Sequence, residues 1–240
     1  MDPDFYEIPE ILKCAMDPNI NASMHPFDNH RGSGLPELVI LGLTEEALSV
    51  MMDMLRVMVM VENHASGTLV NLNITALSCR RDRVHHRLLS LPRGVELSPG
   101  PKTDFYECCR LAALMLADAV LFPMPPWAGI PQKLVAEIKQ CVEKINLTVL
   151  HEGRRFFIWL LMLAGIAATG MPERPWFEQR LLPLLSIEGV SRWTELKKIV
   201  TSFLWMDSAC DGGAIILWDE IAAVLRTPGV RSRNDRSASS

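Results

Sequence analysis

Apolar residues recur at steps of three and four along most of this chain, the spacing that places side chains on one face of an α-helix. Between residues 45 and 63 the apolar positions are Leu48, Met51, Met52, Leu55, Met58 and Val59. Thr44 stands at the expected N-cap, and Glu45 and Glu46 follow in the first turn, where negative charge is favourable. The pattern predicts an amphipathic helix over residues 45–63, with methionines as core filler.

The same periodicity predicts seven further helices and no strand. Their expected ranges are 72–91, 103–122, 131–145, 153–169, a short helix ending near 185, 192–204 (capped by Ser191) and 215–225. The apolar stretch 156–170 is shorter than the roughly 18–20 residues that cross a membrane, which favours a buried core helix. In it, Gly165 and Gly170 either admit a neighbouring helix or end this one. We therefore expect an all-α fold, a single irregular multi-helix domain of about eight helices.

Changes in composition divide the chain into three parts. Residues 1–34 are rich in Pro, Asp, Asn and His and predict an irregular or flexible segment, residues 35–227 form the helical domain, and the polar residues 228–240 predict a disordered tail. Within the domain, "MPERPW" at 171–176 predicts a rigid turn, and "DSACDGG" at 207–213 predicts a connection between helices.

The chain has a formal net charge of −4 and a pI of about 5.9. A dedicated DNA-binding domain usually carries a basic excess, so this composition argues against one for the chain as a whole. The six cysteines include no Cys-x-x-Cys pair and fit neither a zinc module nor a dense disulfide scaffold. With no secretory signal at the N-terminus, we expect an intracellular protein that is not secreted, with mostly buried thiols.

Motifs for catalysis and for nucleotide binding are missing. The chain has no Gly-x-Ser-x-Gly elbow and no glycine-rich phosphate loop. The neighbouring pairs His85–His86 and Cys108–Cys109 point in different directions on a helix and rarely bind one metal together. We therefore expect no cofactor, no metal and no enzymatic activity. A pocket between apolar helices stays open as an alternative, with Met52, Met115, Trp159 and Met162 as its lining.

The most basic stretch is "SCRRDRVHHRLLSLP" at 78–92, where Arg80, Arg83 and Arg87 share one stripe of the predicted helix beside its apolar stripe. Either this helix reads DNA, or the arginines lie over neighbouring helices and pair with acidic side chains. The acidic chain favours the second interpretation.

Four phrases resemble the C-terminal half of the fungal-specific transcription factor domain, the helical region that follows the binuclear zinc cluster in many fungal regulators. They are "LSCRRDRVHHRLLSLP", "YECCRLAALMLADAVLFPMPP", "WLLMLAGIAATGMPERPWF" and "WTELKKIVTSFLWMDSACDGGAIILWDE", which stand in the family's order within about residues 72–220. The resemblance implies an all-α regulatory domain with no catalytic residues. The positions that carry it, which we expect to be structural, are Arg80, Arg83, Arg87, Glu173, Arg174, Trp176, Asp207 and Cys210.

In that family, DNA contact belongs to an N-terminal six-cysteine zinc cluster. Residues 1–70 of this chain contain one cysteine, Cys14, so the cluster is missing and we do not expect direct DNA binding. The expected function is that of a non-enzymatic regulatory module acting through protein or effector contacts. The alternative is a small-molecule-binding protein or enzyme. Nuclear localisation is implied by the resemblance alone, and the cytoplasm is the alternative location. We expect no association with a membrane. Homodimerisation stays open.

Overall fold

The computed structural model describes residues 30–69, 73–121 and 129–226, which form ten α-helices, a 3-10 turn and no strand. The helices are α3 (Leu38–Leu41), α4 (Glu45–Ala65), α5 (Ile74–Ser90), α6 (Pro101–Val120), α7 (Ile130–Lys144), α8 (Leu147–Glu152), α9 (Arg154–Ala167), α10 (Arg174–Ile187), α11 (Trp193–Thr201) and α12 (Asp207–Arg226), with η2 (Gly94–Glu96) before α6. The all-α prediction is confirmed. The predicted disordered tail, Cys14 and most of the predicted N-terminal segment lie outside the described residues.

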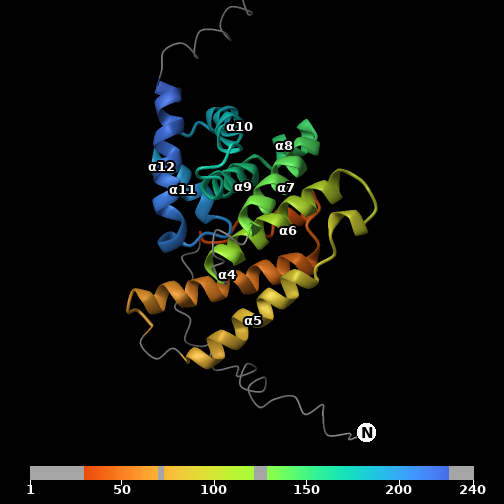
Figure 1. Cartoon of the computed structure of the whole chain (residues 1–240), viewed down its shortest axis with the longest axis vertical. Coiled ribbons are helices and arrows are strands. Elements are labelled where there is room, and N and C mark those ends of the chain that lie inside the picture. Colours follow the sequence, from red (N-terminus) through yellow and green to blue (C-terminus); the bar gives the residue numbers. More distant parts are fainter. Residues whose placement is uncertain (1–29, 70–72, 122–128, 227–240) are drawn as a thin grey trace, which may run out of the picture.

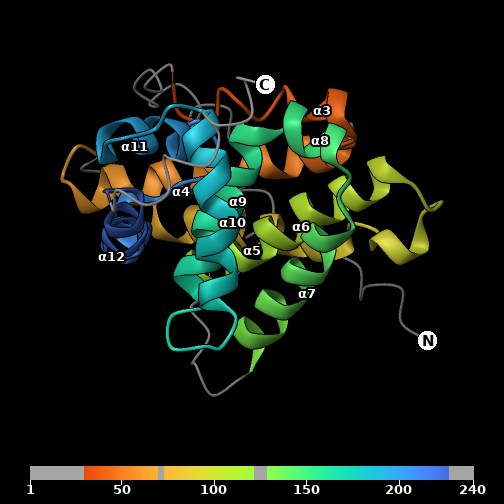
Figure 2. The ribbon, with the colours of Figure 1, turned by 90° about the horizontal axis from the view of Figure 1, so that it is seen from above.

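Helix α9 lies at the centre of the molecule (Figures 1 and 2). It packs against α6, α7, α8, α10, α11 and α12, and every residue from Phe156 to Gly165 is buried. This confirms that the most apolar stretch of the sequence is a core helix. None of the helices in the described ranges combines the length and apolar character that crossing a membrane requires.

Aromatic side chains fill the space around α9. The rings of Phe156 and Trp159 lie 5.6 Å apart, and both contact Phe203, which follows α11. The indole Nε1–H of Trp159 donates a 2.7 Å hydrogen bond to the carbonyl of Leu204. The buried indole is thereby satisfied, as a polar group in an apolar core must be.

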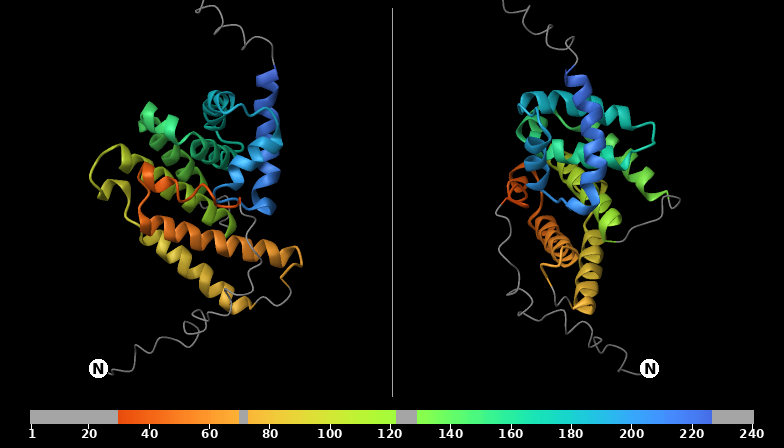
Figure 3. Two further views of the ribbon diagram at one scale, coloured as in Figure 1. Left: turned by 180° about the vertical axis from the view of Figure 1, so that it is seen from behind. Right: turned by 90° about the vertical axis from the view of Figure 1, so that its left-hand side faces the viewer.

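Helices α4 and α5 form a pair at the end of the molecule away from α10 (Figure 3). The predicted cap of α4 is confirmed, because the Thr44 hydroxyl accepts a 3.2 Å hydrogen bond from the backbone N–H of Ala47. Methionines and valines are buried on the inner face of α4, which packs against both α5 and α6. Helix α5 buries only Ala76, Val84 and Leu88, so most of its surface stays accessible.

The predicted connection at 207–213 is wrong, because these residues form the first two turns of α12. Gly212 and Gly213 favoured a connection in the prediction because glycine lowers helix propensity. A Cβ on Gly213 would lie 2.6 Å from Cγ2 of Ile166 in α9, and a Cβ on Gly165 would lie 2.7 Å from Cδ2 of Leu217. The glycines therefore let α9 and α12 approach closely, as expected for Gly165. Gly170, at φ +78°, lies in the turn after α9.

Three other boundaries differ from the prediction. Helix α6 begins at Pro101, two residues before the predicted start at 103, because proline is well suited to a first helical position. Helix α11 begins after Arg192 and ends earlier, at Thr201, and the hydroxyl of Ser191 bonds the Glu195 carboxylate instead of capping the backbone. The short helices α3 and α8 were not predicted, because four to six residues are too few to show a periodicity.

Residues 30–34 are irregular, as expected, but they are anchored to the domain. The backbone N–H groups of Gly32 and Gly34 donate to the carbonyls of Thr201 and Ser202, at 3.1 and 2.8 Å. Leu35, which follows, is fully buried. The described part of the domain therefore starts before the predicted residue 35.

Candidate functional site

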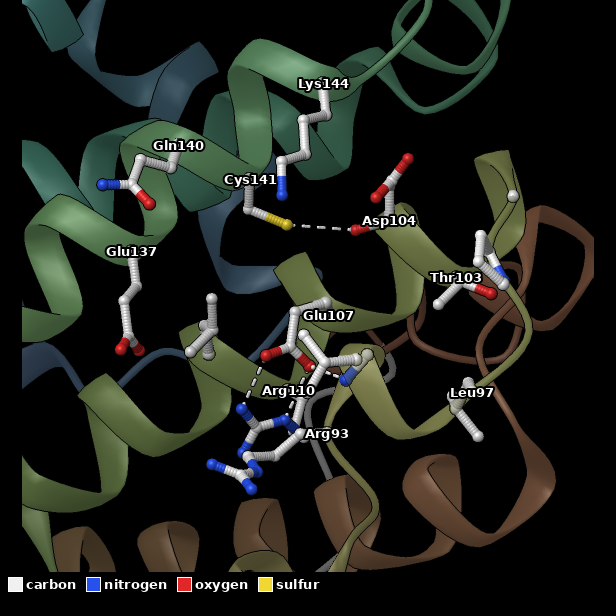
Figure 4. A pocket seen from close by; sticks show the side chains of 15 residues that line it. Arg93, Leu97, Thr103, Asp104, Glu107, Arg110, Glu137, Gln140, Cys141 and Lys144 are labelled. Atoms are coloured by element: carbon white, nitrogen blue, oxygen red, sulfur yellow. Dashed lines mark hydrogen bonds and ion pairs between the residues drawn. The ribbon is translucent and has the colours of Figure 1, made fainter.

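A pocket of about 450 Å³ opens between η2, α6 and α7 (Figure 4). Its lining combines charged and apolar side chains from all three elements: Arg93, Gly94, Val95, Leu97, Pro99, Gly100, Thr103, Asp104, Glu107, Arg110, Leu111, Glu137, Gln140, Cys141 and Lys144. The volume lies within the roughly 300–1,000 Å³ of typical small-ligand sites. We take this pocket, called the α6–α7 pocket below, as the candidate functional site.

Helical spacing explains how the two helices present these groups. Asp104, Glu107 and Leu111 follow one another at steps of three and four along α6, so they share one face. On α7, Glu137, Cys141 and Lys144 do the same. The two faces meet because α6 and α7 pack against each other along their length.

An ion pair between a buried arginine and a partly buried glutamate lines the pocket. Arg110, whose side chain is 8% exposed, donates from Nε and Nη2 to the two carboxylate oxygens of Glu107, at 2.8 and 2.7 Å. Glu107 also accepts a 2.9 Å hydrogen bond from the backbone N–H of Gly94, which fixes η2 to α6. Burial raises the pKa of Glu107, but the hydrogen bonds from Arg110 and Gly94 outweigh it and hold the pKa below the ordinary value.

Two thiols lie next to this pair. The Sγ atoms of Cys108 and Cys141 are 3.2 Å apart, and Cys141 also donates to the backbone carbonyl of Asp104 at 3.2 Å. The hydrogen bond that Cys108 donates to Cys141, together with burial, raises the pKa of Cys108 well above the ordinary value, and burial does the same for Cys109. A thiol that stays protonated is a poor nucleophile, so the raised pKa values of Cys108 and Cys109 argue against a nucleophilic role for these two residues.

Three polar side chains of the pocket have no hydrogen bond or ion pair with any other residue that the structure describes: the carboxylate of Asp104, the amide of Gln140 and the ammonium of Lys144. Cys141 contacts the backbone carbonyl of Asp104, and Lys144 follows Cys141 by about one helical turn. Asp104 and Lys144 therefore lie at the same end of the pocket (Figure 4). These groups are available to a ligand.

None of the residues singled out from the sequence lines the α6–α7 pocket. The Glu107–Arg110 pair carried a signal, because opposite charges three residues apart meet on a helix. Nothing in the sequence pointed to Asp104 and Lys144, because they stand on different helices and only the packing of α6 on α7 brings them to one pocket.

The arginines of the basic stretch have three different environments. Arg87 bonds the Asp53 carboxylate and, at 3.1 Å, the Ser49 hydroxyl of α4, which agrees with the predicted pairing. Arg83 is exposed, and no ion pair with a described residue engages it. Arg80 is half-buried, and its Nε is buried with no partner in the described chain.

Arg174 is one of the few buried charged residues. Its guanidinium donates to the carbonyl of Gly165 at 2.8 Å, to Thr169, and to the carboxylate of Glu220 in α12 at 2.7 and 3.0 Å. Arg174 therefore bonds a backbone carbonyl near the end of α9, which fits a structural role. The stretch around it is not all turn, however, because α10 begins at Arg174 and Glu173 is its N-cap residue.

Trp176 is partly buried against the core and contacts Phe177 edge-on, with ring centroids 5.0 Å apart. Lys139 and Arg180 lie over its ring at 5.7 and 5.3 Å. This environment fits the structural role that we expected for Trp176.

Asp207 and Cys210 lie in the first turns of α12. Asp207 pairs with Arg31 and with Lys197, each at 2.8 Å, and thereby ties the start of α12 to two other segments. Cys210 lies in the stretch predicted to be a connection, but it is helical and 4% exposed, and burial raises its pKa to about 11.

A second pocket, of about 500 Å³, lies between α3, α8 and the start of α9, with Arg154 and Glu188 in its lining. Neither pocket is lined by the four residues proposed for an apolar cavity, of which Met115, Trp159 and Met162 are core residues. Within the described residues, no group of three or more His, Cys, Asp or Glu side chains is arranged to hold a metal ion.

Comparison of the chain with protein-family models, with curated proteins and with solved structures gave no match.

Proposed function

We propose that this chain is a non-enzymatic helical module of a transcription regulator, located in the nucleus, which acts through contacts with a protein or a small effector. In this proposal it does not read DNA sequence itself. The basis is the resemblance of four phrases to the fungal-specific transcription factor domain, together with the way these phrases pack.

The observation that carries the proposal is that hydrogen bonds join the four phrases pairwise. The Tyr106 hydroxyl of the second phrase donates to the carbonyl of Pro92 in the first, at 2.8 Å. Trp159 of the third phrase donates to the carbonyl of Leu204 in the fourth, and Arg174 of the third phrase donates to the carboxylate of Glu220 in the fourth. The first phrase thus lies against the second, and the third against the fourth, which supports the proposal that they belong to one domain of that family.

An effector in the α6–α7 pocket would be well placed to influence the whole domain. The pocket is built on α6, and α6 packs against α4, α5, α7 and α9. A ligand that changes how α6 and α7 meet therefore acts on the helix that joins the α4–α5 pair to the core. This pocket also favours the second candidate, a small-molecule-binding protein without a role in transcription.

The charge distribution argues against DNA reading by α5. Arg87, the third arginine of its stripe, is engaged with Asp53, and the whole chain is acidic. Phosphate contacts draw on clustered, available cations.

A reporter assay tests the proposal. The full chain is fused to the DNA-binding domain of a bacterial repressor, and a reporter carries the matching operator. We expect a change in reporter output relative to the DNA-binding domain alone, and a variant unfolded by Trp159→Asp should abolish it. An unchanged output from a folded, equally abundant fusion would overturn the regulatory role. Sequence-specific binding by the unfused chain in a gel-shift assay would overturn the statement that this chain does not read DNA sequence itself.

A further inference from the structure

We infer that the α6–α7 pocket binds a small zwitterion with an apolar part, such as an α-amino acid with an aliphatic side chain. The inference rests on the proposed function, in which this ligand is the effector. It names what the pocket recognises.

The first argument is the balance of charge in the pocket. The lining holds three cationic side chains and three anionic ones: Arg93, Arg110 and Lys144 against Asp104, Glu107 and Glu137. A ligand with a single charge gains no net attraction from such a site. A ligand that carries both charges can match the separate signs.

The second argument concerns which of these charges are available. Glu107 and Arg110 satisfy each other, Arg93 pairs with Glu96 at 3.0 Å, and Glu137 lies 3.8 Å from Lys133. Asp104 and Lys144 remain, one of each sign, on facing helices at the same end of the pocket. A ligand ammonium on Asp104 and a ligand carboxylate on Lys144 would satisfy both.

The third argument is the apolar wall that completes the pocket. Leu97 and Leu111 line it beside Val95, which is 87% exposed although it is a large apolar residue. An aliphatic group in the pocket would cover this wall and remove apolar surface from water. The requirements together describe a zwitterionic head with an aliphatic body.

Isothermal titration calorimetry on the purified full chain tests the inference with three matched probes. Leucine has both charges, 4-methylpentanoate lacks the ammonium, and 3-methylbutylamine lacks the carboxylate. We expect saturable binding of leucine, at least tenfold tighter than that of either analogue. No saturable binding of leucine, or equal affinity for one analogue, would overturn the inference.

Matched variants locate the site. We expect Asp104→Asn and Lys144→Gln each to weaken leucine binding at least tenfold, while Asp219→Asn and Lys102→Gln, exposed and outside the pocket lining, leave it unchanged. Circular dichroism melting confirms that each variant is folded. Leucine binding that survives both pocket variants would place it elsewhere and overturn the inference.

The binding measurement does not depend on transcription. A reporter response without leucine binding would overturn this inference and leave the regulatory proposal standing. Leucine binding without a reporter response would overturn the regulatory proposal and leave the inferred binding site standing.

Discussion

Arg174 of α10 and Glu220 of α12 are joined by two hydrogen bonds, of 2.7 and 3.0 Å, across 46 residues of sequence. The same guanidinium bonds the last turns of α9 through the Gly165 carbonyl. One side chain therefore fixes three helices to one another.

Replacing Arg174 should destabilise the domain strongly. Arg174→Met keeps the apolar stem but leaves the Gly165 carbonyl without its donor, so we expect a loss of about 2–4 kcal/mol in unfolding free energy. Urea denaturation measures this loss. Arg155→Met, at an exposed position of α9, serves as the control and should change stability by less than about 0.5 kcal/mol. Equal stability of the two variants would contradict the anchoring role of Arg174.

The two adjacent glycines of α12 should respond oppositely to alanine. Gly213→Ala places a Cβ 2.6 Å from Ile166, and overpacking of this kind costs roughly 1–3 kcal/mol. Gly212→Ala meets nothing within 4 Å, so its higher helix propensity should raise stability by up to about 1 kcal/mol. Thermal melts of the two variants test this, and a stabilising Gly213→Ala would show that the helices can separate without cost.

The Arg87–Asp53 pair should contribute to stability rather than to DNA affinity. Both side chains are 34% exposed, so solvent screening limits the loss in Arg87→Gln to about 1 kcal/mol or less. Arg83→Gln, on the exposed side of α5, is the matched control and should be neutral. Fluorescence anisotropy with duplex DNA, run beside urea denaturation, separates the two effects. A selective loss of DNA affinity with unchanged stability in either variant would restore the DNA-reading interpretation of α5.

The Glu107–Arg110 pair predicts a loss of stability in acid. Because the folded pKa of Glu107 lies below its ordinary value of 4.5, the unfolded chain binds this proton more readily than the folded one. The stabilisation is therefore complete above the ordinary value and is lost as the pH falls through the folded pKa. Glu107→Gln should remove this component of the pH dependence measured by urea denaturation between pH 3 and 6. Glu143→Gln, at an exposed position, is the control and should keep this pH dependence. The same pH dependence of unfolding free energy in the unmodified protein and in both variants would refute the role given to Glu107.

Four of the thiols should be protected in the folded protein. Cys108, Cys109, Cys141 and Cys210 are all buried, and burial keeps Cys109 and Cys210 protonated. In a variant with Cys14→Ser and Cys79→Ser, a chromogenic disulfide reagent should react slowly with native protein and completely in urea. Rapid labelling of the native double variant would show that the helices around these thiols open readily.

The sequence predicted those parts of the fold that rest on local chemistry. A long apolar periodicity defines α4, the Thr44 hydroxyl satisfies the orphan N–H of its first turn, and the continuous apolar run of α9 can only be buried. The prediction started one helix at residue 103, after Pro101, and left residues 207–213 outside any helix because glycine lowers helix propensity. Pro101 instead begins α6 at a first-turn position, and Gly213 admits a neighbouring helix, a contact that no local pattern reveals.

The α6–α7 pocket was beyond sequence reasoning for a similar reason. Asp104 and Lys144 acquire their shared environment only when α6 packs on α7, and the 3-10 turn at Gly94 completes the wall. The phrases that resemble a family pointed to Arg174 and Asp207, which hold helices together. Residues that hold a fold together and residues that leave side chains available to a ligand are different sets in this protein.

The central position of α9 also limits how the chain can be divided. A cut in the turn after α9 would separate it from α10, α11 and α12, and a cut before it would separate it from α6, α7 and α8. Either fragment would keep a long apolar surface with no cover. The two halves should therefore regain structure only by reassociating, so the chain behaves as one indivisible folding unit and could serve as a split-protein complementation pair.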